Sequence, residues 1–167
     1  MKIRVQLTEK DYMSAYWLAL RGNRTFRLMM MFVAINGLGM AIYNFVELAR
    51  GEVVDVTRWL IVGLMGLFAW AAFVRGPSQM KKAYRVRKQL QMPYEIELGE
   101  EGLKWTSEQG YLAQAWSDLL KWRVGDDLIA IYQTGAVCFL LPRHAFAAEA
   151  DFQASIEILR SKMGTPA

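Results

Sequence analysis

The sequence is poor in the residues that build metal sites and disulfides. It has one histidine, His144, and one cysteine, Cys138, among its 167 residues. A multi-histidine metal site within one chain is therefore excluded, because such sites need several imidazole or thiolate ligands. A single cysteine cannot form an intrachain disulfide, which agrees with a reducing, cytoplasmic environment. We expect Cys138, which lies in an apolar stretch, to be a buried structural thiol and not a nucleophile paired with His144.

Recognisable catalytic patterns are also missing. No glycine-rich phosphate loop is expected, because Gly37–Gly39 and Gly63–Gly66 fall inside apolar runs. The neighbouring carboxylates of Glu95 and Glu97 occupy the polar positions of an alternating segment, and Glu100–Glu101 occupies a turn, so all four are expected on a solvated surface. The sequence therefore predicts no enzyme activity, no cofactor and no metal.

Two long stretches carry no charge. These are Leu28–Val46 and Trp59–Val74, and five charged residues lie between them: Glu47, Arg50, Glu52, Asp55 and Arg58. At about 1.5 Å per residue the first stretch spans roughly 28 Å, close to the roughly 30 Å of a bilayer core. The second spans only about 24 Å and needs the residues just before it, with Arg58 reaching outward. We predict a transmembrane hairpin over residues 28–75, with spans 28–46 and 57–75.

The charges around this hairpin predict its orientation. Residues 1–27 hold six basic and two acidic side chains, residues 75–88 hold six basic and none acidic, and residues 89–167 hold six basic and eleven acidic. By the positive-inside rule both termini are cytoplasmic and the loop faces outward. The overall net charge of +4 does not predict a nucleic-acid partner, because the cations flank the apolar runs and the C-terminal part is acidic. The charged first twenty residues predict no signal peptide.

Outside the hairpin, alternating patterns predict a small antiparallel β domain. A strand is expected over residues 2–7, then a helix from Glu9 to about Leu20 with a Thr8–Asp11 capping pair and a left-handed cap at Gly22. After residue 93 the apolar period becomes two, and six short strands are expected as one meander: 94–98, 103–106, 111–115, 116–124, 128–132 and 137–141. A helix over residues 148–162 follows and ends at Gly164.

The predicted fold class is an α+β membrane protein. It combines a two-helix transmembrane hairpin with a cytoplasmic antiparallel β-barrel or sandwich closed by a C-terminal helix. The count of seven strands and one helix matches a pleckstrin-homology-like barrel with the hairpin inserted after its first strand. The expected segments are residues 1–27 (strand and helix of the cytoplasmic domain), 28–75 (hairpin), 76–92 (basic juxtamembrane segment) and 93–167 (pleckstrin-homology-like domain with its helix).

Two sets of residues are candidates for contacts with lipid or with another helix. Cations next to a membrane attract anionic lipid by about 1 kcal/mol each. The candidates for such contacts are Lys81, Lys82, Arg85, Arg87 and Lys88. A role of these cations in fixing the membrane topology would also explain their presence, without any lipid-binding site. Small residues let helices approach closely, within the hairpin or in a dimer, and the candidate packing face is Ala34, Gly37, Ala41, Gly63 and Gly66. Asn36, near the middle of the first span, is expected to seek a hydrogen-bond partner.

Several short motifs resemble the YcxB-like family. They are Leu7-Thr8-x-x-Asp11-Tyr12, Glu101-Gly102-Leu103, the Trp116 segment and Leu141-Pro142-Arg143-x-x-Phe146 before the final helix. The resemblance implies a bacterial membrane protein of uncharacterised function, and it provides no catalytic residues. The expected location is therefore the bacterial inner membrane, with two spans.

The leading functional hypothesis is a protein-binding or regulatory module held at the cytoplasmic face. Its partner, another protein or a second copy of the chain, would use an open sheet edge or the groove beside the final helix. The alternative is a module that senses anionic lipid through the basic juxtamembrane segment. A membrane enzyme and a small transporter subunit rank lower, the latter because it depends only on Asn36 and the small-residue face.

Overall fold

The computed structural model describes residues 1–51, 55–135 and 137–166, and it divides into two compact units. The first unit comprises Met1–Gly22 and Met80–Ala167, and the second comprises Asn23–Gln79. We call them the sheet unit and the hairpin unit. The chain therefore leaves the sheet unit after its first helix and returns to it some sixty residues later, roughly the length of two membrane spans and a loop.

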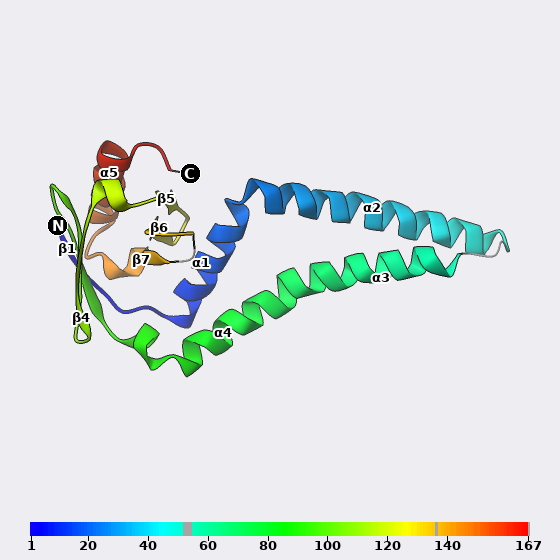
Figure 1. The fold of residues 1–167 in the computed structure, drawn as a ribbon, viewed down its shortest axis with the longest axis horizontal. Coiled ribbons are helices and arrows are strands. Elements are labelled where there is room, and N and C mark those ends of the chain that lie inside the picture. Colours follow the sequence, from blue (N-terminus) through cyan, green and yellow to red (C-terminus); the bar gives the residue numbers. More distant parts are fainter. Residues whose placement is uncertain (52–54, 136, 167) are drawn as a thin grey trace. The chain divides into compact units, whose positions relative to one another are not determined.

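The hairpin unit consists of two long helices that lie side by side (Figure 1). The first is α2 (Arg24–Ala49), and the second begins at Val56 and comprises α3 (Val56–Trp70), the π-helical η1 (Ala71–Arg75) and the start of α4 (Gly76–Val86). From Met80 onward α4 belongs to the sheet unit. The side chains of Asn23 and Asp55 accept hydrogen bonds from first-turn amides and cap the two helices. Of the charged residues predicted between the spans, Glu52 lies outside the described residues.

Both helices are long and apolar enough to cross a membrane, judged by length and composition. Only 6% of the most apolar window of α2 is buried, and none of the corresponding window of the second helix. A core helix of a soluble domain would hide most of such a window. These helices instead present their large apolar side chains outward.

The sheet unit is α+β and contains two antiparallel sheets. One has the strand order β1-β2-β3-β4, formed by β1 (Lys2–Val5), β2 (Tyr94–Leu98), β3 (Gly102–Ser107) and β4 (Gly110–Ala115). The other has the order β5-β6-β7, formed by β5 (Lys121–Val124), β6 (Leu128–Tyr132) and β7 (Cys138–Pro142). The predicted α+β class is confirmed. The predicted single meander is wrong for the described residues, and so is the barrel of the two predicted alternatives, barrel or sandwich, because the strands form two separate sheets.

The chain leaves the first sheet at η3, a short 3₁₀ turn over Trp116–Asp118. A strand was predicted from Trp116 onward, and that part of the prediction is wrong. The Trp116 indole is buried and its Nε1 donates to the Glu100 carbonyl at 3.2 Å. Leu119 is buried beside it in the core. The apolar pattern here is satisfied by a turn that packs two side chains inward, so it does not require a strand.

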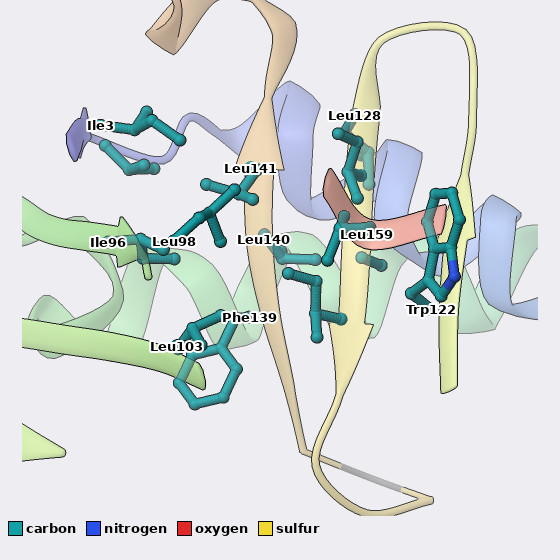
Figure 2. Packing of buried hydrophobic residues seen from close by; sticks show 14 of the residues in the cluster. Ile3, Ile96, Leu98, Leu103, Trp122, Leu128, Phe139, Leu140, Leu141 and Leu159 are labelled. Carbon is teal, nitrogen blue, oxygen red and sulfur yellow. The ribbon is translucent and has the colours of Figure 1, made fainter. Parts of the chain in front are cut away.

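One hydrophobic core joins the two sheets and the final helix. In Figure 2 Ile3, Ile96, Leu98 and Leu103 of the first sheet lie on one side of β7, whose Phe139, Leu140 and Leu141 also enter the core. The predicted alternation of β2 is confirmed, since Ile96 and Leu98 are buried and Glu95 is not. The helix α5 (Glu149–Met163) adds Phe152 and Leu159, and Gly164 ends it with a positive φ of 79°.

The first helix, α1 (Glu9–Arg21), begins as predicted and ends differently. Both halves of the Thr8–Asp11 capping box are present. The predicted left-handed cap at Gly22 is wrong, because its φ is −79°. Arg123 caps the helix instead, and its guanidinium donates to the carbonyls of Leu18, Ala19 and Gly22. A Cβ on Gly22 would collide with that guanidinium, so the glycine is needed for space and not for its backbone angle.

Candidate functional site

The basic juxtamembrane segment divides into paired and unpaired cations. Arg85 and Lys81 both contact the Glu9 carboxylate, at 2.9 Å and 3.8 Å. The Arg85 hydrogen bond, with smaller Coulombic contributions from Arg85 and Lys81, holds the pKa of Glu9 below its usual value. These two cations therefore tie α4 to α1 within the sheet unit. The sequence pattern missed this role, because nothing local marks Glu9 as the partner of residues more than seventy positions away.

The other three candidate cations have no such partner. Lys82, Arg87 and Lys88 are exposed and form no ion pair within residues 1–51, 55–135 and 137–166. Arg87 directly follows α4, and Lys88 begins the 3₁₀ turn η2 (Lys88–Gln91). An external anion can reach all three without first breaking an ion pair.

The small residues predicted as a packing face do not all lie between the helices. Gly37 and Ala41 are partly covered, and a Cβ on Gly37 would come within 3.5 Å of the Met65 sulfur on α3. Ala34, Gly63 and Gly66 are exposed, and a Cβ on either of these glycines would meet no atom within 4 Å in the described chain. The α2–α3 contact therefore uses part of the predicted set, and a role of the remainder in dimerisation stays a prediction.

The polar residue of interest in α2 is Asn44 and not the predicted Asn36. The Asn36 amide donates to the Phe32 carbonyl one turn earlier at 2.9 Å, so its own helix satisfies it. Asn44 is fully buried, and neither polar atom of its side chain has a hydrogen-bond partner among the described residues. Close by in sequence, Glu47 pairs with Arg58 across the hairpin at 2.8 Å. Arg58 was predicted to reach outward from the second span. The structure adds that it pairs with the Glu47 carboxylate of the same chain.

The sheet edges differ in how they are protected. Natural sheets protect exposed edges with charges, proline or bulges. Lys2 and Arg4 lie on β1, Lys121 and Arg123 lie on β5, and β7 ends at Pro142. Strand β4 has neither charge nor proline, in the sequence Gly-Tyr-Leu-Ala-Gln-Ala.

Strand β4 is also the exposed edge. It pairs with β3 alone, and five of its six residues are exposed in the burial pattern. Tyr111 is 62% exposed. By contrast four of the five β7 residues are buried. An uncharged, accessible edge strand of this kind is a template for adding another strand. We call Gly110–Ala115 the open edge.

An acidic hollow lies beside the open edge. It has a volume of about 460 Å³ and is formed by the β2–β3 turn and the end of β4. The carboxylates that line it belong to Glu97, Glu100 and Glu101, and the one lining cation is Lys104. Three negative charges against one positive charge favour a basic side chain in this hollow.

The turn before α5 contains the contact that sequence analysis missed most clearly. His144, in η4 (Arg143–Ala145), places Nε2 2.9 Å from the buried Asp11 carboxylate on α1. Its neighbour Arg143 bonds Glu149 at 2.9 Å and lies over the Phe152 ring, so it helps to dock the turn against α5. No periodic pattern could have linked His144 to Asp11, because 133 positions separate them.

Cys138 and Trp122 behave as structural elements. Cys138 is partly buried, and burial raises the pKa of its thiol, which disfavours the nucleophilic thiolate. The Trp122 indole is buried and donates to the Gly164 carbonyl at 3.0 Å, so it anchors the end of α5. Within the described ranges no group of three or more histidine, cysteine, aspartate or glutamate side chains could hold a metal ion.

Comparison with known families supports the resemblance drawn from the motifs. The family model described as YcxB-like protein matches residues 98–159. The matched residues run from the end of β2 into α5 and exclude the hairpin unit. No curated protein and no solved structure matches the chain. The chain thus carries a YcxB-like segment at residues 98–159, and the predicted resemblance to this family is confirmed there.

Proposed function

We propose that this chain is a two-span membrane protein whose sheet unit binds an extended, basic segment of a protein partner at the open edge. The hairpin would lie in a bacterial inner membrane, with the loop outside and both termini in the cytoplasm. The sheet unit would act as a pleckstrin-homology-like binding or regulatory module. Its seven strands and C-terminal helix support this comparison, although the strands form two sheets.

The outward apolar surface of the hairpin unit supports the membrane part of the proposal. In water, large exposed apolar surfaces on a monomer are rare. Leucine and phenylalanine side chains along both helices are exposed, and a bilayer would provide the apolar surroundings they lack. Strand β1 pairs with β2, in the register Lys2 to Glu97, so the chain before and after the hairpin belongs to one folded unit. An even number of spans satisfies that requirement.

The observation that carries the binding function is the open edge. Addition of a strand supplies backbone hydrogen bonds with no need for catalytic side chains, and side-chain pockets then provide selectivity. Strand β4 offers the backbone groups, and the acidic hollow beside it would select a lysine or arginine in the incoming segment. We therefore commit to a basic extended segment as the occupant.

A peptide-binding experiment on the full chain tests this function. The protein, held in a neutral-lipid nanodisc, is titrated with a fluorescent peptide of alternating valine and lysine and with a matched valine–glutamate peptide. We expect the basic peptide to bind at least about tenfold more tightly, because only it complements the acidic hollow. Photocrosslinking from position 111 should join the basic peptide to the open edge.

Matched variants separate edge binding from general charge attraction. Ala113→Lys places a charge on the open edge and should abolish binding of the basic peptide. Ala154→Lys adds the same charge at an exposed position of α5 and should leave binding nearly unchanged. Equal binding of the two peptides, or equal losses in the two variants, would refute the proposal. If crosslinks form only between two copies of the chain, the open edge mediates self-association and does not bind a basic partner.

A second candidate function is recognition of anionic lipid, favoured by Lys82, Arg87 and Lys88. These cations are exposed and unpaired in the described chain, whereas Lys81 and Arg85 contact Glu9. Hydrogen exchange of residues 80–88 should slow in nanodiscs that contain anionic lipid, compared with neutral nanodiscs. Raising salt from about 0.1 M to 1 M should remove the effect, since the screening length falls from about 10 Å to about 3 Å. Protection of residues 80–88 from hydrogen exchange that does not depend on salt or on lipid charge would contradict recognition of anionic lipid.

A further inference from the structure

A second hollow in the sheet unit is lined by unpaired positive charge and has no part in the proposed protein binding. It lies beside β1, the first turn of α1 and the turn η4, and its volume is about 460 Å³. Sites for small molecules commonly occupy roughly 300–1,000 Å³. The side chains of interest in its lining are Arg4, Gln6, Thr8, Glu9, Tyr84 and His144.

The imidazole of His144 lines this hollow and contacts the buried carboxylate of Asp11. Its Nε2 lies 2.9 Å from Asp11 Oδ2, and the Asp11 side chain is only 5% exposed whereas that of His144 is 51% exposed. The same Asp11 oxygen accepts from the backbone amide and the hydroxyl of Thr8, each at 2.7 Å. A carboxylate that is ionised only accepts hydrogen bonds, and opposite such a group Nε2 is the ring nitrogen that carries the hydrogen. The other ring nitrogen, Nδ1, has no partner among the described residues.

Arg4 supplies a second unpaired group. It lies opposite Glu95 in the β1–β2 register, but that carboxylate pairs with Lys2 at 3.3 Å. Arg4 is exposed and forms no ion pair in the described parts of the chain. Its guanidinium is charged at every physiological pH and presents a planar fork of donors.

The negative charges of the hollow are already compensated. Glu9 lines it but binds Arg85 at 2.9 Å and Lys81 at 3.8 Å. Asp11 is buried behind His144 and takes hydrogen bonds from Thr8. The Tyr84 hydroxyl is also engaged, since it donates to the Leu7 carbonyl at 2.7 Å. The groups left to meet a ligand are the Arg4 fork, the Gln6 amide and Nδ1 of His144.

We propose that this hollow binds a small oxyanion of the phosphate class, gripped by Arg4 and His144. Arginine matches two phosphate oxygens at once. A monohydrogen phosphate can accept from Arg4 and donate its remaining proton to the neutral Nδ1, and a protonated imidazole would donate to it instead. A free phosphate and the headgroup of an anionic phospholipid share the oxygens that accept from Arg4 and from a protonated imidazole, whereas only the free phosphate has a proton to donate to the neutral Nδ1.

The test uses the fact that the sequence has one histidine. In the full chain, held in neutral-lipid nanodiscs and labelled in the imidazole, every histidine ring signal belongs to His144. Titration with inorganic phosphate should shift that signal to saturation, and sodium chloride at the same ionic strength should not. Arg4→Gln should weaken phosphate binding about tenfold or more, as expected for loss of a charge-assisted hydrogen bond.

Two controls distinguish the hollow from general attraction to positive charge. Lys10→Gln removes an exposed cation that pairs with Asp127 and does not line the hollow, so binding should persist. Arg4→Lys should retain part of the affinity, and circular dichroism establishes that each variant is folded. The proposal is overturned by absence of a saturable shift, by an equal response to chloride, or by equal losses in the Arg4→Gln and Lys10→Gln variants.

A last arm identifies the source of the oxyanion. Nanodiscs with anionic phospholipid are compared with neutral ones, without inorganic phosphate. A shift of the His144 signal that needs both anionic lipid and Arg4 assigns the hollow to a headgroup. If the signal moves only with inorganic phosphate, the hollow takes a free ligand. Either result supports oxyanion binding, and a lipid-induced shift that survives Arg4→Gln counts against it.

Discussion

The same apolar residue types have opposite surroundings in the two units of this chain. In the sheet unit Ile96 and Leu141 have no exposed surface, whereas in the hairpin unit Leu38 is 65% exposed. Burial of apolar surface stabilises a fold in water by about 25 cal/mol per Å². The sheet unit therefore obtains its stability within itself, while the hairpin unit leaves most of its large apolar side chains exposed. In the proposed function, a bilayer would surround the apolar surface that the hairpin unit leaves exposed.

The largest expected effect comes from making the same change in both units. Leu141→Ala removes a fully buried side chain and should lower the free energy of unfolding of the sheet unit by about 2–5 kcal/mol. Leu64→Ala, at an exposed position of α3, should leave that free energy unchanged. Hydrogen exchange of β6 and β7 in the two variants measures the difference. Equal destabilisation would show that the two units share one core.

Introducing a charge on an exposed apolar face of the hairpin unit tests whether that face lies in lipid or in water. Leu38→Arg, near the middle of α2, should disfavour membrane insertion by about 2.5–3.5 kcal/mol. A glycosylation-based insertion assay reports the inserted fraction. The matched change Glu157→Arg, at an exposed position of α5, should have no effect on insertion. If Leu38→Arg were equally harmless, the exposed helix face would be in water.

A substitution at Gly22 tests packing at the end of α1, where the chain leaves the sheet unit. Gly22→Ala forces the Arg123 guanidinium away from three carbonyls, and loss of hydrogen bonds from a charged group costs about 1.5–3 kcal/mol. Gly110→Ala is the control, because a Cβ there would meet no atom within 4 Å in the described chain. Chemical denaturation of the full chain compares the two variants. A stable Gly22→Ala protein would mean that Arg123 is not the cap of this helix.

Matched caps in the two units should show the smallest effect. Thr8→Ala removes the N-cap hydroxyl of α1 and should cost the sheet unit about 0.5–2 kcal/mol. Asn23→Ala removes the corresponding cap of α2 and should leave the stability of the sheet unit unchanged. Hydrogen exchange of residues 9–14 provides the measurement. A loss in that segment after Asn23→Ala would contradict independent stability of the units.

Features set by short stretches of sequence could be predicted. The alternation of Ile96 and Leu98, the Thr8–Asp11 capping box and the glycine end of α5 each depend on residues within one turn or strand. Propensity and periodicity act at that range. The two apolar helices were predictable for the same reason.

Features set by distant partners could not be predicted. Trp116 alternates like a strand residue, but its buried indole bonds Glu100 and the chain turns there. Gly22 has the sequence pattern of a left-handed cap, but the helix end is capped by Arg123, about a hundred residues away in the sequence. The Asp11–His144 contact and the open edge likewise depend on which elements become neighbours. Sequence patterns alone do not specify such pairings.

Topology mapping tests the central claim most directly. Reporters that are active on only one side of the membrane are placed after Gly51 and at each terminus of the full chain. The account predicts an extracytoplasmic reporter at Gly51 and cytoplasmic reporters at both termini. The termini share one side because β1 and β2 belong to one sheet, and the basic flanks of the hairpin predict that this side is the cytoplasm. A cytoplasmic signal at Gly51, or termini on opposite sides, would contradict a two-span hairpin inserted into one folded unit.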